Sequence, residues 1–138
     1  MYRVLFFLLF SGLIFSSCED DSESEGDDCL LYGTWTLSYV ESDGDCQFAC
    51  VSENSLPGDC DNITDYGSCL TVTINDDGSF NGSDGTGSQG GTWAGDCSQG
   101  APVSATMTDG TQLNGSIVTV SANELSINSD GSIYVFDK

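Results

Sequence analysis

The sequence contains no histidine and only two basic residues, Arg3 and Lys138, against 22 acidic ones. The absence of histidine removes the usual general base and the commonest transition-metal ligand. The shortage of bases excludes nucleic acid as a partner, because neutralising phosphates requires several Lys or Arg side chains. Catalysis would have to rely on carboxylates, tyrosines and serines. We therefore expect a non-catalytic protein that holds no cofactor and no metal.

A hydrophobic run long enough to cross a bilayer is also missing. The apolar run at residues 4–15 has 12 residues, whereas a transmembrane helix needs about 20. Arg3 before it and two serines after it are typical of a secretory signal peptide. Cys18 follows directly, so residues 1–17 resemble a bacterial lipoprotein signal, with Phe15 in place of the more common Leu. The resemblance implies acylation of Cys18 and a membrane anchor; plain secretion with an unmodified Cys18 is the alternative.

The cysteine count agrees with this interpretation. Seven cysteines cannot all pair within one chain, but acylation of Cys18 leaves an even set. An even set in an exported domain indicates a disulfide framework. Spacing alone leaves the pairing open among Cys29, Cys46, Cys50, Cys60, Cys69 and Cys97.

An acidic stretch separates Cys18 from the rest of the chain. Residues 19–28 contain seven acids and no apolar side chain, which is typical of a disordered tether. Directly after the cysteine, such a run also resembles the surface-export signal of certain gram-negative bacteria. We therefore expect residues 18–28 to tether an outer-membrane lipoprotein exposed on the cell surface, with an inner-facing location as the alternative. Residues 29–138 suit one domain.

Alternation of apolar and polar residues dominates this domain, and no helical period does. In residues 33–40, Trp35 alternates with threonines and serines, and turn residues at 75–78, 109–110 and 128–131 separate further alternating runs. The pattern predicts an all-β, antiparallel sheet folded over a core. The positions expected to face inward are Leu37, Tyr39, Val72, Ile74, Phe80, Met107, Ile127 and Phe136.

Two segments break the alternation. Residues 43–69 hold four cysteines, and we expect a disulfide-stapled loop insertion there, with one helical turn around residues 46–54. Residues 81–91 are rich in glycine and predict a flexible connection between strands.

The order of these motifs resembles a known family. "LLYGTWTLSYVE" resembles the Gly-x-Trp signature of lipocalins, here Gly33 and Trp35. "LTVTINDDGSF", "GGTWAG" and "VTVSANELSINSDGSIYVF" follow in the order of bacterial lipocalin-like domains on lipoproteins. The resemblance implies an up-and-down barrel of about eight strands, in which a basic residue from the last strand packs on the tryptophan; only Lys138 is available for this role. A β-sandwich is the alternative architecture.

Two functions suit such a domain. One is a non-catalytic surface module that binds a protein or glycan, for which Tyr32, Tyr66 and Trp93 offer aromatic contacts. The other is a carrier or scavenger of a small apolar ligand in a barrel cavity. Acidic residues at 43–45 and 59–65 could attract calcium, but neither stretch completes an EF-hand pattern, so solvated loops are favoured. Carboxylate-based glycoside cleavage is disfavoured. Among 22 acids, some pair will always have a suitable spacing, so the presence of such a pair is no evidence for this activity.

Acylation at Cys18 is directly testable. Cells fed a labelled fatty acid should incorporate the label into the parent protein and not into Cys18→Ala, because the thiol is the acceptor. The other six cysteines should contain no free thiol in non-reducing mass mapping. A Cys18→Ala protein that still takes up label contradicts the anchor.

Overall fold

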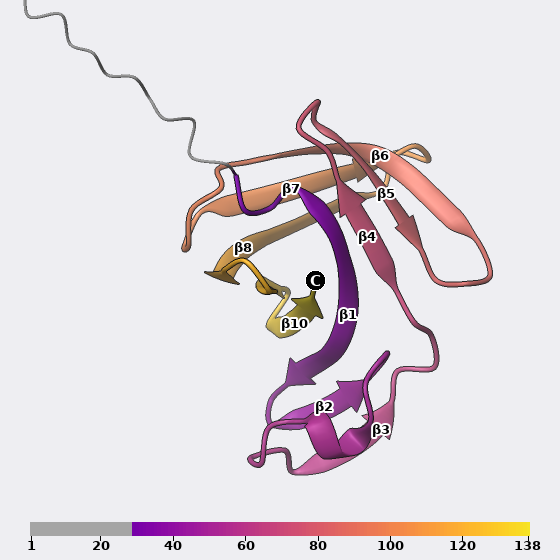
Figure 1. The fold of residues 1–138 in the computed structure, drawn as a ribbon, viewed down its shortest axis with the longest axis vertical. Coiled ribbons are helices and arrows are strands. Elements are labelled where there is room, and N and C mark those ends of the chain that lie inside the picture. Colours follow the sequence, from indigo (N-terminus) through magenta and orange to yellow (C-terminus); the bar gives the residue numbers. More distant parts are fainter. Residues whose placement is uncertain (1–28) are drawn as a thin grey trace, which may run out of the picture.

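The structure, a computed structural model, describes residues 29–138, and its regular elements are β-strands apart from one short 3₁₀ turn (Figure 1). The predicted signal peptide, the acidic tether and Cys18 lie outside the described residues. One short 3₁₀ turn, η1, spans Glu53–Ser55. Within residues 29–138, no helix has the length and apolar character needed to cross a membrane. The strands are β1 (Gly33–Ser42), β2 (Asp45–Phe48), β3 (Asn62–Asp65), β4 (Thr71–Ile74), β5 (Ser79–Ser83), β6 (Ser88–Gly95), β7 (Pro102–Met107), β8 (Gln112–Val120), β9 (Glu124–Ser129) and β10 (Ser132–Asp137).

Eight of these strands close into an antiparallel barrel. From β4 to β10, each strand pairs with its neighbour in sequence, and β1 pairs with β4 on one edge and with β10 on the other. The β1–β10 register runs from Thr36 opposite Asp137 to Ser42 opposite Ser132. The predicted all-β up-and-down barrel is confirmed, and the β-sandwich alternative is wrong.

A β-bulge at Ser38 changes which side chains of β1 face the interior. The register with β10 shifts between Leu37 and Tyr39, so Ser38 has no direct partner. Before the bulge, Trp35 and Leu37 are fully buried in the core, and after it Val40 joins them. The prediction that Tyr39 faces inward is wrong. The extra residue reverses the alternation and turns Tyr39 to the outer face of the barrel.

The predicted insertion at residues 43–69 forms an extension of the sheet at the far end of β1 (Figure 1). Beyond Thr36, where the pairing of β1 with β4 stops, β1 pairs with β2, and β3 adds to β2 in parallel. The amides of Ala49 and Cys50 continue this contact by donating to the carbonyls of Ser38 and Leu37 at 2.8 and 3.2 Å. The expected helical turn is partly wrong, because residues 46–48 lie in β2 and only η1 is helical. Pairing with the free edge of β1 favours the extended form there.

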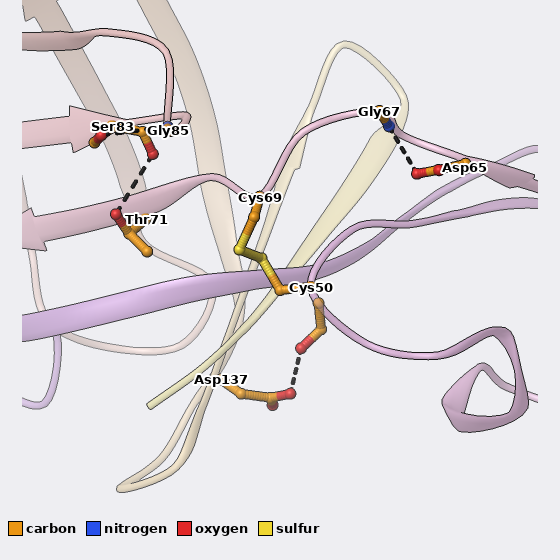
Figure 2. Close-up of a disulfide and its surroundings, with 9 residues drawn as sticks. Cys50, Asp65, Gly67, Cys69, Thr71, Ser83, Gly85 and Asp137 are labelled. Atoms are coloured by element: carbon orange, nitrogen blue, oxygen red, sulfur yellow. Dashed lines mark hydrogen bonds between the residues drawn. A yellow bond between two sulfur atoms is a disulfide. The ribbon is translucent and has the colours of Figure 1, made fainter.

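All six cysteines of the domain are paired. Cys46–Cys60 lies within the insertion, and Cys50–Cys69 joins Cys50 to the last residue of the insertion, two residues before β4 and beside β1 (Figure 2). Cys29–Cys97 joins the start of the domain to the connection after β6 across a sequence separation of 68 residues. Closing so long a loop restricts the unfolded chain strongly, by about 4 kcal/mol in the chain-entropy account.

The glycine-rich segment, residues 81–91, is not the flexible connection predicted from its composition. Only residues 84–87 form a turn, while the rest pairs across β5 and β6, with Asn81 opposite Gly90. A Cβ atom at Gly91 would lie 2.1 Å from the Thr106 carbonyl oxygen and 2.7 Å from Cε1 of Phe80. Glycine is therefore required there for close approach of the neighbouring strand and of the Phe80 ring.

We expect Gly91→Ala to lower the free energy of unfolding by about 3 kcal/mol, because the added methyl group overlaps backbone atoms of β7. Gly87→Ala is the matched control, since its Cβ meets nothing within 4 Å. Denaturant unfolding of the two variants measures the difference. Equal stability of the two variants would show that the strands have room at residue 91.

Candidate binding site

The barrel is closed at the end where β1 begins. Trp35 is fully buried there, and its indole N–H donates to the Leu31 carbonyl at 2.8 Å. Leu31 is itself 2% exposed, and Cys29, two residues before it, packs against the same core. Residues 29–32 thus fold across this end and plug it.

Lys138 completes this floor. Its ammonium lies 4.6 Å from the centroid of the Trp35 ring, and its amide donates to the Asn123 carbonyl at 3.1 Å. Gly33 has a φ of +129°, and a Cβ there would lie 2.8 Å from Cε of Lys138. The glycine therefore leaves room for the lysine stem, and the tryptophan face receives its charge. Lys138 takes the place that the lipocalin resemblance implies for a basic residue.

Buried apolar side chains fill the half of the barrel next to this floor. They come from strands far apart in sequence, which meet only because the barrel closes. Besides Leu31 and Trp35, the buried cluster consists of Leu37, Val40, Ile117, Leu125 and Phe136.

The opposite half of the interior keeps apolar surface exposed. Ala105 pairs with Trp93 on one side and Leu113 on the other, so the three side chains share the inner face. Leu113 is 49% exposed, and Met107 and Ala105 are only half-buried. Inward-facing apolar residues of a solid core would be covered. Here Ala105, Met107 and Leu113 form an exposed apolar inner surface, the cup, toward the end with the β5–β6, β7–β8 and β9–β10 turns.

Most of the residues predicted to face inward do so. Leu37, Phe80 and Phe136 are buried, and Val72, Ile74 and Ile127 pack against the core. Met107 shares the inner face with Gly91 near the open end. Leu113 was missed, because it stands alone among polar residues and shows no alternation. Only the pairing of β8 with β7 reveals its direction.

Each of the three hairpin turns at the open end carries an aspartate. Hydrogen bonds from the hydroxyl and amide of Thr86 lower the pKa of Asp84, and the Thr111 amide does the same for the pKa of Asp109. Asp130 adopts a left-handed φ of +52° in the β9–β10 turn. These residues shape the turns and place negative charge around the opening.

The two acidic stretches considered for calcium are brought together by the pairing of β2 with β3. The Asp61 amide donates to the Gly44 carbonyl at 2.8 Å, and the Asn62 side-chain amide donates to Asp45 at 2.6 Å. Within residues 29–138, no group of three or more His, Cys, Asp or Glu is arranged to hold a metal.

Two of the three aromatic residues suggested as a contact surface lie together. Tyr32 and Trp93 pack edge to face with their ring centroids 6.0 Å apart, and the Trp93 indole donates to the Asn75 carbonyl at 3.0 Å. Tyr66 follows β3 in the insertion. The structure therefore provides an aromatic pair beside the floor rather than a three-residue surface.

The floor contact predicts an effect of the terminal lysine on stability. Lys138→Met keeps an apolar stem over Trp35 but removes the ammonium, and should lower the free energy of unfolding by about 1 kcal/mol. Lys138→Arg keeps a cation and should stay close to the parent. Urea unfolding followed by Trp fluorescence measures both. A methionine variant as stable as the parent would contradict the cation–π contribution.

No protein-family model matches the sequence, and neither does any curated protein. Among solved structures, a lipocalin-like protein from Bacteroides uniformis superposes with a TM-score of 0.54 at 17% identity, covering 79% of this chain and 98% of the other. An uncharacterized protein from Bacteroides eggerthii gives a TM-score of 0.53 at 15% identity, covering 78% and 98%. The closed eight-stranded barrel, its Gly33–Trp35 floor and these neighbours show that the chain has a lipocalin-like fold.

Proposed function

We propose that this protein is an exported, lipid-anchored and non-catalytic binding protein that holds a small apolar ligand in the open half of its barrel. The observation that carries the proposal is the exposed apolar inner surface around Leu113, Met107 and Ala105. The interior of an eight-stranded barrel is either filled by side chains or just wide enough for one small ligand, and the exposed inner surface here favours the ligand. The lipocalin-like fold suggests ligand binding as well, so the carrier function is favoured over a surface module for protein or glycan partners.

The position of the floor supports an orientation for the anchored protein. The disulfide Cys29–Cys97 fixes the start of the domain at the closed end, beside Leu31 and Trp35. A lipid on Cys18 would therefore attach the domain to the outer membrane through this end. The open end would point away from the membrane, toward ligands in the surroundings of the cell.

The positions of the charged side chains limit the class of ligand that the barrel can bind. The only base in residues 29–138 is Lys138, and its ammonium is engaged at the closed end. The opening is ringed by aspartates, so a carboxylate or phosphate would find no cationic partner there. We therefore expect an apolar ligand without a negative charge in the barrel.

The cup can be tested with N-phenyl-1-naphthylamine, an uncharged dye that fluoresces in apolar surroundings. Ala105→Phe fills the cup from the inner face of β7 and should weaken dye binding at least about tenfold, since the ring occupies the ligand volume. Thr106→Phe adds the same ring on the outer face of the same strand and should leave the dye affinity unchanged. Dye that binds Ala105→Phe as tightly as the parent would contradict the site.

Native mass spectrometry of the protein released gently from its own membrane identifies the ligand itself. A bound mass of hundreds of daltons that survives removal of the lipid on Cys18 is the expected result. A bare polypeptide mass, together with no dye binding, would overturn the carrier function and favour a surface module for proteins or glycans.

A further inference from the structure

A second pocket lies outside the barrel, between its wall and the insertion. Its volume is about 360 Å³, which is within the range of small-molecule sites. From the insertion, Val51, Leu56 and Pro57 form an apolar side. This pocket shares no lining residue with the floor or with the open cup.

The barrel side of the pocket comes from β1, β9 and β10. The bulge at Ser38 turns Tyr39 into the pocket, and its partner Val135 lies beside it, only 7% exposed. The Ser38 hydroxyl donates a hydrogen bond to the Asp137 carboxylate, which fixes the Asp137 side chain beside β1. The pocket thus combines apolar walls with a fixed carboxylate.

Glu124 and Asp137 place two negative charges directly opposite each other in this pocket. They are register partners on β9 and β10, and both line the pocket. Like charges at directly opposite positions of neighbouring strands are destabilising. The only base of the domain does not relieve them, because the Lys138 ammonium lies over Trp35. Proteins keep local conflicts of this kind mainly at functional or strained sites, which marks this pocket as a candidate site.

The negative charges around the pocket also affect the pKa of Tyr39. Burial raises the pKa of the Tyr39 hydroxyl, and the carboxylates of Glu41, Glu124, Asp137 and Asp59 raise it further. The negative field is thus directed at the pocket from β1, β9, β10 and the insertion together.

We infer that this pocket binds a small organic ammonium ion, with its charged nitrogen between Glu124 and Asp137 and its apolar body against Leu56, Pro57 and Val135. An ammonium neutralises both carboxylates and covers the apolar wall at the same time. A bare divalent metal fits less well, because calcium favours six to eight oxygen ligands. Residues 29–138 offer no group of three acidic, His or Cys side chains arranged for a metal.

The test uses the full chain and 2-phenylethylammonium as probe, with the uncharged 2-phenylethanol of similar shape as comparison. Isothermal titration should show saturable binding of the ammonium compound, at least about tenfold tighter than that of the alcohol. The affinity should fall as salt is added, because the attracting carboxylates are accessible to solvent. Equal affinity for the two compounds would overturn the inference.

Three variants that each remove one negative charge locate the binding site. Asp137→Asn keeps an oxygen for the Ser38 hydroxyl, and both this variant and Glu124→Gln should bind the ammonium about fivefold more weakly or worse. Asp130→Asn is the matched control on the same β9–β10 hairpin. It tolerates the left-handed backbone and should bind like the parent. An equal loss in Asp130→Asn would mean that only net charge matters, and would overturn the site.

Two further measurements separate this pocket from the barrel cup. In the unmutated protein, nuclear Overhauser contacts should connect the probe with the methyl groups of Leu56 and Val135. Ala105→Phe, which blocks the cup, should leave the ammonium affinity unchanged. Loss of ammonium binding in Ala105→Phe, or contacts with Leu113 instead of Leu56, would place the cation in the cup and overturn the outer site.

Discussion

The pairing of β1 with β10 is the interaction on which the rest of the structure depends. It joins the start of the domain to its end, so the barrel, its interior and its floor exist only when it forms. It also positions the last two residues of the chain. Successive residues at the end of a strand point to opposite faces. Asp137 therefore reaches the outer pocket while Lys138 reaches Trp35 at the floor.

The bulge at Ser38 gives one strand two roles. Before the bulge, β1 contributes Trp35 and Leu37 to the core; after it, Tyr39 is released to the outer face while Val40 continues the core. The insertion pairs with β1 at this same point, through Ala49 and Cys50. The disulfide Cys50–Cys69 holds it where β1 passes from pairing with β4 to pairing with β2. The outer pocket is thus a consequence of the bulge and the disulfide acting together.

The features of the fold that depend on short stretches of sequence were predictable from the sequence. Alternation and turn residues predict the β4–β5 hairpin, where Gly78 takes the expected positive φ of 81°, and the Gly33–Trp35 signature predicts the floor. Alternation places Tyr39 on the wrong face, because Trp35, Leu37 and Tyr39 alternate regularly in the sequence and give no sign of the bulge. Composition alone does not predict the structure of residues 81–91, because glycine serves flexibility and close packing alike, and only the neighbouring Phe80 and Thr106 distinguish these roles. Leu113 and the Glu124–Asp137 pair depend on strand register, which composition does not encode.

The uneven distribution of charge links the two binding surfaces. Lys138, the single base of residues 29–138, is held at the closed end, so both the open cup and the outer pocket are left with carboxylates alone. Fifteen acids remain in residues 29–138, and Asp77, Asp84 and Asp109 accept hydrogen bonds within their own hairpin turns. Glu124 and Asp137 differ, because they oppose each other against an apolar wall. The aspartates in the turns contribute to solubility and turn geometry. Glu124 on β9 and Asp137 on β10 are instead the reason why the ligand inferred for the pocket carries a positive charge.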